Sequence, residues 1–235
     1  NLTLTAVNIF AGSTSNSMCA VFNDGTAQCW GDNSYGKLGD GTTTNRSSPV
    51  KVVGLSNVVK ITSGASHSCA LLDDDSVKCW GLNSSGQLGN NSTTNSTSPV
   101  SVPGSYNDIA VGSNHTCGIK TTGIVNCWGA SSDGSYKIGR FAFEETANGT
   151  HSSRNTPAPI YLTNSFVSIS ASTFNTCGIT NIGDTFCWGA DTFYRTGCSN
   201  TAMPTVTVDS CFGAGITNPS KISISDTGCA IESTG

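Results

Sequence analysis

Cysteine is the residue type whose spacing points most directly to chemistry in this sequence. The string Cys-x9-Cys-Trp-Gly occurs four times in a chain that holds 11 cysteines. Two thiols at a fixed spacing can form a disulfide, remain buried as free thiols or bind a metal ion. The paired positions are Cys19 and Cys29, Cys69 and Cys79, Cys117 and Cys127, and Cys177 and Cys187.

A β-hairpin would place the two cysteines of each pair opposite one another. With a three-residue loop at residues 23–25, Cys19 faces Cys29 on the neighbouring strand. Such a loop needs a third residue in the left-handed region, which is usually glycine. That position is held by Gly25, Asp75, Gly123 and Gly183 in the four repeats. The sequence therefore predicts cross-strand cysteine pairs.

We interpret these pairs as disulfides, because identical pairs in a Ser/Thr-rich chain with few charges are typical of oxidising compartments. Zinc is disfavoured, since separate hairpins do not bring four ligands together. Cys198 and Cys211, in a linker, are predicted to bridge each other. Cys229 begins a fifth hairpin and is expected to be unpaired, because its partner position lies beyond Gly235.

The hairpin belongs to a longer repeat, whose first cysteines are 50, 48 and 60 residues apart. Each repeat contains about four short apolar strands separated by turns, which is typical of a β-propeller blade. We expect an all-β, single propeller-like domain over 1–235, with blades near 4–52, 53–102, 103–162 and 163–208 and part of a fifth at 215–235. The tryptophans that follow the cysteines should point to the opposite blade face and form an inter-blade core: Trp30, Trp80, Trp128 and Trp188.

Residues 64–89 carry the strings His67-Ser-Cys-Ala-Leu and Cys79-Trp-Gly-Leu-Asn, followed by Gly-Gln-Leu-Gly. This segment resembles the regulator of chromosome condensation repeat, and the resemblance extends over nearly the whole chain. It implies a seven-bladed propeller. The chain departs from the family in its second cysteine before each Trp, and four and a fraction repeats are too few for seven blades. We therefore expect further chain, or a neighbouring copy, to complete the propeller.

Asparagine in N-x-[ST] sequons is the second feature that suggests an extracellular protein. The predicted glycosylation sites are Asn1, Asn45, Asn83, Asn90, Asn91, Asn95, Asn114 and Asn148. Five of them follow the Gly-x-Leu-Gly-type turn, where successive blades would present loops along one rim: Asn45, Asn90, Asn91, Asn95 and Asn148. We expect covalent glycans on that rim.

Other residues with chemical potential are His67, His115, His151, Ser34 with Lys37, Asp73–Asp75, and Asp32 with Asp40. The first two histidines occupy equivalent repeat positions, which favours structural hydrogen bonding. Ser34 and Lys37 match S-x-x-K but lie in a turn, and the three acids lack calcium-loop spacing. Asp32 and Asp40 leave a weak cation site open. We predict no catalytic residue, no metal site and no cofactor.

The net charge of −4, with 11 scattered basic residues, favours neither nucleic acid nor an acidic membrane as a partner, and no apolar run is long enough for a membrane span. We expect a non-enzymatic extracellular glycoprotein that builds a filament or cell-surface assembly. The alternative is a secreted propeller that binds a protein, with candidate contacts at Phe141, Phe143, Phe193 and Tyr194. An intracellular nucleotide exchange factor for a small GTPase is the least favoured reading.

Overall fold

A computed structural model describes residues 3–11, 15–130, 153–160, 164–173, 175–189, 219–225 and 228–233 of this chain. Two complete antiparallel sheets come first, and in each the strands pair in chain order. Blade 1 consists of β1 (Ala6–Ala11), β2 (Ser17–Phe22), β3 (Ala27–Gly31) and β4 (Arg46–Lys51). Blade 2 consists of β5 (Val58–Ser63), β6 (His67–Leu72), β7 (Val77–Gly81) and β8 (Ser96–Val102). A short 3-10 helix, η1 (Ser34–Gly36), lies between β3 and β4.

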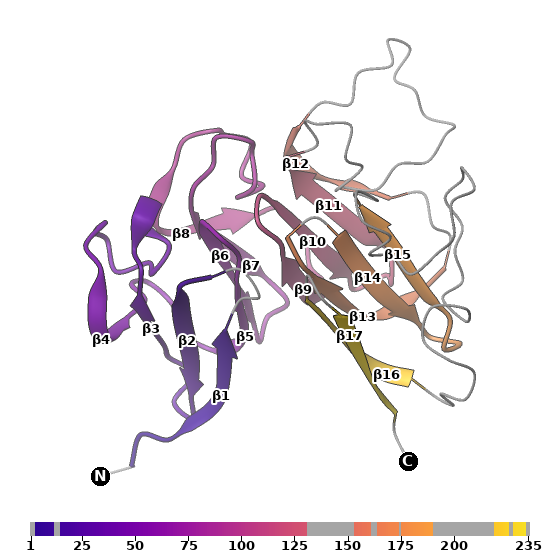
Figure 1. Ribbon diagram of the computed structural model, residues 1–235, viewed down its shortest axis with the longest axis horizontal. Helices are drawn as coiled ribbons and strands as arrows, with labels where there is room; N and C mark the ends of the chain where they lie inside the picture. The colour runs from indigo at the N-terminus through magenta and orange to yellow at the C-terminus, as the bar shows by residue number, and fades with distance from the viewer. Residues whose placement is uncertain are drawn as a thin grey trace.

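The later repeats follow the same order (Figure 1). Blade 3 has four strands: β9 (Tyr106–Val111), β10 (His115–Lys120), β11 (Val125–Gly129) and β12 (Arg154–Pro159). Blade 4 has three described strands: β13 (Phe166–Ala171), β14 (Asn175–Thr180) and β15 (Thr185–Gly189). Blade 5 has two: β16 (Pro219–Ser225) and β17 (Gly228–Ser233). The predicted all-β class with four-stranded blades is confirmed, while the strand expected at 203–208 lies outside the described residues.

The hairpin between the second and third strands has the predicted register. Cys19 pairs with Cys29, and the same alignment recurs at Cys69, Cys117 and Cys177. The third loop residue is left-handed in all four blades, with φ of 73° at Gly25, 64° at Asp75, 84° at Gly123 and 89° at Gly183. Aspartate tolerates this region better than most side chains, which explains why blade 2 forms the same loop without glycine.

The blades follow one another in an arc because the first strand of each blade contacts the first strand of the next. We call these inner strands: β1, β5, β9, β13 and β16. Hairpin tips reinforce the contact, since the carbonyl of Gly25 accepts a hydrogen bond from the Val58 amide at 2.9 Å. The same bond joins the Asp75 carbonyl to the Tyr106 amide and the Gly123 carbonyl to the Phe166 amide. Each hairpin tip is thus fixed to the start of the next inner strand.

Because the strands of each blade run up and down in chain order, the connections lie on two faces of the arc, one at each end of the strands. The hairpin face carries the turns between second and third strands and the connections from blade to blade: residues 23–26, 52–57, 73–76, 103–105, 121–124 and 181–184. The loop face, at the opposite ends of the strands, carries residues 32–45, 64–66, 82–95 and 112–114. In Figure 1 the chain enters β1 at the bottom of the view, on the hairpin face, and the loop between β7 and β8 lies at the upper end of the blades on the left.

Hydrophobic cores lie between adjacent blades. The first core joins Cys19, Val21, Leu38 and Val52 of blade 1 to Ile61 and Trp80 of blade 2. Ile9 occupies the position in blade 1 that Ile61 occupies in blade 2, because Ile9 pairs with Ala20 as Ile61 pairs with Ala70. Ile61 is 0% exposed, whereas Ile9 is 59% exposed. No described blade covers that side of blade 1, which we call the uncovered face: Ile9, Met18 and Trp30.

A β-bulge interrupts every inner strand at the same place. Val58 pairs with Leu72 and Lys60 with Leu71, so Val59 is the extra residue between them. The corresponding extra residues in the other blades are Val7, Asn107, Val167 and Ser220. A bulge leaves its extra residue unpaired and changes the direction of its side chain. The side chains of Val7, Val59, Asn107 and Val167 are exposed. They lie at the end of each inner strand that is on the hairpin face.

Candidate functional site

The cysteine pairs are the sites that the sequence marked most clearly, and three form disulfides in the structure. The bonds join Cys19 to Cys29, Cys69 to Cys79 and Cys117 to Cys127. All six side chains are buried in the cores between blades. Each bond closes a hairpin whose strands already pair, so it restricts a local loop in the unfolded chain.

The remaining cysteines are described only in part. Cys177 is disulfide-bonded, and the backbone of β15 places residue 187 directly opposite it. Cys229 lies in β17 with Ile224 as its backbone partner. The side chains at positions 187 and 229, and the whole of Cys198 and Cys211, lie outside the described part of the chain. Their predicted pairing therefore stays a prediction.

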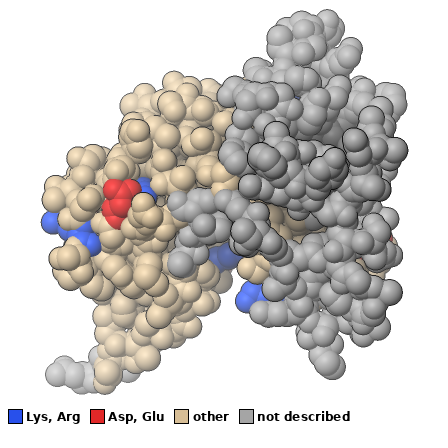
Figure 2. All heavy atoms as spheres, in the orientation of Figure 1, with Lys and Arg blue, Asp and Glu red and all other residues tan. Residues whose placement is uncertain are grey.

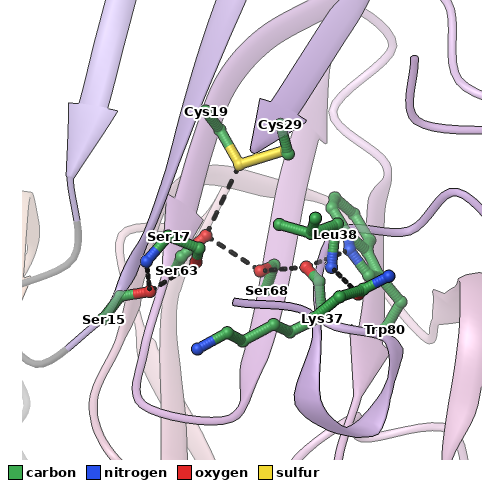
Figure 3. The surroundings of a disulfide bond; sticks show 10 residues. Ser15, Ser17, Cys19, Cys29, Lys37, Leu38, Ser63, Ser68 and Trp80 are labelled. Atoms are coloured by element: carbon green, nitrogen blue, oxygen red, sulfur yellow. Dashed lines mark hydrogen bonds between the residues drawn. A yellow bond between two sulfur atoms is a disulfide. The ribbon is translucent and has the colours of Figure 1, made fainter. Parts of the chain in front are cut away.

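A chain of hydrogen bonds runs from the first disulfide across the seam between blades 1 and 2 (Figure 3). The Ser63 hydroxyl lies 3.7 Å from Cys19 Sγ and 2.8 Å from the Ser68 hydroxyl. Ser68 donates to the backbone carbonyl of Lys37 at 2.8 Å, and the Trp80 indole donates to the same carbonyl at 2.8 Å. One carbonyl of blade 1 therefore accepts two donors from blade 2.

The next seam repeats this arrangement with different side chains. The hydroxyl of Thr116 and the indole of Trp128 donate to the carbonyl of Gln87 at 2.9 and 3.0 Å. Ser68 and Thr116 both directly precede a repeat cysteine, as does Thr176. Our sequence reasoning missed the role of this hydroxyl position, although the strings His-Ser-Cys, His-Thr-Cys and Asn-Thr-Cys displayed it. Met18 stands at this position in blade 1, where the seam partner is absent from the described residues.

The tryptophans otherwise lie as predicted. Trp80 and Trp128 are fully buried and Trp188 is 8% exposed. Trp30 differs, because it belongs to the uncovered face and is only half-buried. Trp80, Trp128 and Trp188 thus lie in cores between blades, while no described blade packs against Trp30, so its inter-blade role stays a prediction.

His67 and His115 have the structural role expected for them. Both rings are fully buried, and Nε2 of His67 lies 2.8 Å from the Thr116 hydroxyl. Because that hydroxyl already donates to Gln87, the Nε2–H of His67 must be the donor. Nε2 of His115 lies 2.9 Å from Thr176 in the same way. Burial, together with the neighbouring His115, lowers the pKa of His67 to about 3, so this ring is neutral at physiological pH.

The loop between β7 and β8 is organised by one buried asparagine. The Nδ2 of Asn83 donates to the Asn90 side chain and to the carbonyls of Ser92 and Thr94, at 3.2, 2.9 and 3.1 Å. Its Oδ1 accepts the Leu88 amide at 2.9 Å. Asn33 makes the corresponding bonds in blade 1. Asn83 is 0% exposed, which contradicts its assignment as a glycosylation site, because a glycan is attached to this same nitrogen.

The other described sequons remain compatible with glycans. Asn45, Asn91 and Asn95 are exposed, while Asn90 and Asn114 are half-buried. The Oδ1 atoms of Asn45 and Asn95 each accept a backbone amide at 2.8 Å. All of these residues lie on the loop face. Asn1 and Asn148 lie outside the described residues.

The acidic candidates do not form a metal site. Lys37 is 1% exposed, and its Nζ lies 2.6 Å from Asp32, a hydrogen bond that holds the pKa of Asp32 below its usual value. Asp40 pairs with Arg46 at 2.6 Å. Burial would raise the pKa of Asp40, but hydrogen bonds from Thr42 and Arg46 outweigh that effect and lower it. Both carboxylates are neutralised by cations, which removes the weak cation site left open by the sequence.

The remaining candidates have no catalytic arrangement in the described part of the chain. The Lys37 ammonium, taken up by Asp32 and the Ala65 carbonyl, is not available to activate Ser34, whose hydroxyl donates to Asp32. Asp73, Asp74 and Asp75 are exposed at a hairpin tip, and no cluster of three potential metal ligands occurs among the described residues. His151 and the aromatic candidates Phe141, Phe143, Phe193 and Tyr194 lie outside the described residues.

A polar contact between inner strands was not foreseen. Lys60 Nζ lies 2.6 Å from Asp108 Oδ1, which joins blade 2 to blade 3. Asp108 Oδ2 accepts the Ile169 amide of blade 4 at 3.0 Å. One carboxylate therefore links three successive blades. Lys60 and Asp108 each directly follow the bulge residue of their inner strand, and this equivalence was visible in the sequence. Their pairing could not be predicted, because it depends on the curvature of the arc.

Charged groups are sparse over the described part of the surface in Figure 2, where isolated basic and acidic side chains stand among uncharged ones. Such a surface offers no extended basic area of the kind that binds nucleic acid. Within the described residues, no helix is long and apolar enough to cross a membrane.

Comparison with known families identifies the repeat. The family model described as regulator of chromosome condensation (RCC1) repeat matches residues 24–71 and 74–119. A second model with the same description matches 7–37, 58–87 and 107–135. Together the matches run from residue 7 to residue 135, more than half of the 235 residues. No curated protein matches the chain.

Solved structures show the same fold at low sequence identity. Yeast RCC1 (Prp20), solved with Kap60 bound, matches with a TM-score of 0.75 at 18% identity, over 96% of this chain and 53% of its own. Human WBSCR16 matches with a TM-score of 0.67 at 18% identity, over 79% of this chain and 47% of its own. The ectodomain of the receptor kinase CR4 from Physcomitrella patens matches with a TM-score of 0.55 at 20% identity, over 96% of this chain and 46% of its own.

This chain spans about half the length of these solved proteins. At such identities the likeness concerns the fold, and it agrees with the order of strands in each blade and with the repeats that the family models match. The chain therefore belongs to the RCC1 repeat family of β-propeller proteins.

Proposed function

We propose that this chain is a non-enzymatic, extracellular, glycosylated propeller whose function is to bind a protein partner. The observation that carries the proposal is the set of three buried disulfides at equivalent positions of three blades. Stable disulfides of this kind are rare in reducing compartments. The exposed sequons at Asn45, Asn91 and Asn95 support the same location.

Binding, rather than catalysis, agrees with the site chemistry. The described histidines and the buried lysine are used in structural contacts, and propellers offer broad faces for partners. Among the similar solved structures, yeast RCC1 is bound to Kap60, and a study of Prp20p concerns its binding to Gsp1p and histones. Those are intracellular partners of another protein. The CR4 ectodomain provides the extracellular precedent for this fold.

The test is made on the protein in its native cells. An antibody against this chain should label intact cells or their medium, and the denatured, unreduced protein should show few thiols that react with a maleimide. Removal of N-glycans with a glycosidase should increase its gel mobility. Labelling that requires permeabilised cells, with most of the 11 cysteines reactive, would place the chain in a reducing compartment and overturn the proposal.

A structural building block of a filament is the second candidate, and the uncovered face supports it. Ile9 and Met18 are 59% and 39% exposed where later blades bury the equivalent positions. Further blades of a longer chain would cover the same face and leave a monomer. Light scattering on the full native chain separates the two: large particles favour assembly, and a monodisperse monomer excludes it.

A further inference from the structure

The exposed aliphatic side chains of this protein are gathered on one of its two ends. Ten large hydrophobic side chains are exposed among the described residues. Those on the hairpin face are Leu4, Val7, Val53, Val59, Ile124, Val167 and Ile182. Two others, Ile9 and Met18, lie on the uncovered face of blade 1. Tyr35 is the one such side chain on the loop face. Single exposed apolar residues are ordinary, but their concentration on one face is not.

The bulges give this concentration a structural cause. Val7, Val59 and Val167 are each the extra residue of an inner-strand bulge, and they are 62%, 54% and 51% exposed. A strand without the bulge would keep the alternation and turn a side chain at this place toward a neighbouring blade. The repeat thus presents an aliphatic side chain outward at the same place in three blades.

Hydrogen bonds make these side chains part of a continuous, ordered surface. The Gly25 carbonyl at the tip of blade 1 accepts the Val58 amide, directly before Val59. In the same way, the Gly123 carbonyl accepts the Phe166 amide, directly before Val167. Hairpin tip and bulge residue of adjacent blades are therefore held side by side. A preorganised surface of this kind loses little conformational entropy when a partner binds.

Carboxylates predominate at the tips of the hairpin face, while Lys51, Lys78 and Lys120 flank the tips on the adjoining strands. Asp24, Asp73, Asp74 and Asp75 are exposed there, and Asp184 is half-exposed. Hydrogen bonds from Thr26 lower the pKa of Asp24, and those from Ser76 lower the pKa of Asp74, so both carboxylates are charged at neutral pH. The tip residues 23–26, 73–76, 121–124 and 181–184 contain no lysine or arginine.

The sequons have the opposite distribution. Every sequon within the described residues lies on the loop face: Asn45, Asn83, Asn90, Asn91, Asn95 and Asn114. Glycans attached there would shield the loop face, and they would leave the aliphatic side chains of the hairpin face open. Shielding of the loop face rests on the proposed extracellular function, because only a secreted chain receives such glycans.

We propose that the hairpin face is the docking surface of this propeller, and that its occupant is a protein segment with aliphatic side chains flanked by lysine or arginine. The aliphatic side chains of the segment pack on the bulge residues and on Ile124 and Ile182. Its cations pair with the aspartates of the hairpin tips, which steers association and lowers affinity at high salt.

The experiment uses a random-sequence peptide library displayed on phage, selected on the full glycosylated protein. Enriched peptides are synthesised and their affinities are measured for the wild type and for single variants. We expect peptides that combine aliphatic with basic residues. Val59→Asp and Ile124→Asp should each weaken binding at least about tenfold, and Asp73→Lys about threefold to tenfold. If Val59→Asp does not fold, Val59→Ser takes its place, because it removes the aliphatic side chain without adding a charge.

Tyr35→Asp is the matched control, because it adds the same charge to an exposed residue of the loop face. Tyr35 has φ of 64°, a conformation that aspartate tolerates. This variant should bind with wild-type affinity, and glycan removal should not change binding. Peptides that lose affinity with Tyr35→Asp, but not with Val59→Asp or Val59→Ser, overturn the choice of face and leave the proposed binding function standing. A library that yields no enriched peptide would count against both the hairpin face as docking surface and the proposed binding function.

Discussion

The indole nitrogen of Trp80 donates a hydrogen bond to the backbone carbonyl of Lys37 across the seam between blades 1 and 2, at 2.8 Å. The tryptophan comes from the recurring Cys-Trp-Gly string of one repeat, and the carbonyl comes from the turn of the repeat before it. The buried indole finds its hydrogen-bond acceptor in the preceding repeat, and the buried carbonyl finds its donors in the following one. Each blade therefore depends on its neighbour for a buried polar contact as well as for apolar burial.

Trp80→Phe should lower the free energy of unfolding by about 2–3 kcal/mol, through the lost hydrogen bond and the void left beside Leu38. Trp30→Phe is the matched control, since Trp30 is half-buried on the uncovered face, and it should cost about 1 kcal/mol or less. Urea titration followed by circular dichroism measures both. Equal losses for the two variants would contradict the role assigned to the seam.

Replacing one disulfide by Cys69→Ala with Cys79→Ala should destabilise the protein by about 2–3 kcal/mol, the loop-closure entropy expected for a sequence separation of 10. The equivalent change at Cys117 and Cys127 should cost a similar amount. The two losses should be nearly additive, because each bond closes its own hairpin. Thermal melting of the two double variants and of their combination tests this expectation. An unchanged melting temperature would show that the bonds add little.

Acidification should destabilise the protein through His67. Its pKa falls from an ordinary 6.5 to about 3 on folding, because burial disfavours the charged ring. The unfolded chain therefore binds more protons between these values, and stability is complete above pH 6.5 and declines as pH falls toward 3. The slope is at most about 1.4 kcal/mol per pH unit.

His67→Gln keeps a donor near Thr116 but removes the titrating ring, so it serves as the reference. The stability of the wild type minus that of the variant, measured by urea titration from pH 7 to pH 4, should decrease steadily on acidification. All carboxylates are shared by the two proteins and cancel in this difference. A difference that stays constant with pH would mean that His67 binds protons equally in the folded and unfolded chains, which would contradict its lowered pKa.

Asn83→Asp should destabilise the protein by about 2–4 kcal/mol, because the new oxygen would face three acceptors where the amide nitrogen now donates. Asn45→Asp is the control, since Asn45 is exposed and uses its oxygen to accept the Asn33 amide. It should cost about 0.5 kcal/mol or less. Glycopeptide mass spectrometry adds a second measurement: Asn83 should carry no glycan, and occupancy there would contradict the buried position.

Much of the blade could be predicted from the sequence. The spacing of Cys19 and Cys29 fixed the hairpin register, because a three-residue loop with a left-handed third residue allows only one alignment. The tryptophan after the second cysteine then had to lie on the other face, since side chains alternate along a strand. These are local constraints, and they repeat with the chain.

Burial followed from the sequence less directly than strand register did. Asn83 is part of a sequon, but its neighbours along the loop return to surround it, so the motif marks a structural asparagine. Trp30 has the same local sequence as Trp80, yet the two differ in exposure because only Trp80 has a described blade beside it. A sequence motif states which group is present and cannot state what covers it.

The sequence by itself determined the repeat, the strand order and the cysteine pairing within a hairpin. The tertiary structure decided which carbonyl accepts Trp80, that Asp108 joins three blades, and that bulge residues such as Val59 face outward beside the hairpin tips. The physical reason is distance along the chain. Hairpin contacts join residues about ten positions apart and follow from local geometry, whereas contacts between blades depend on how whole sheets pack against each other.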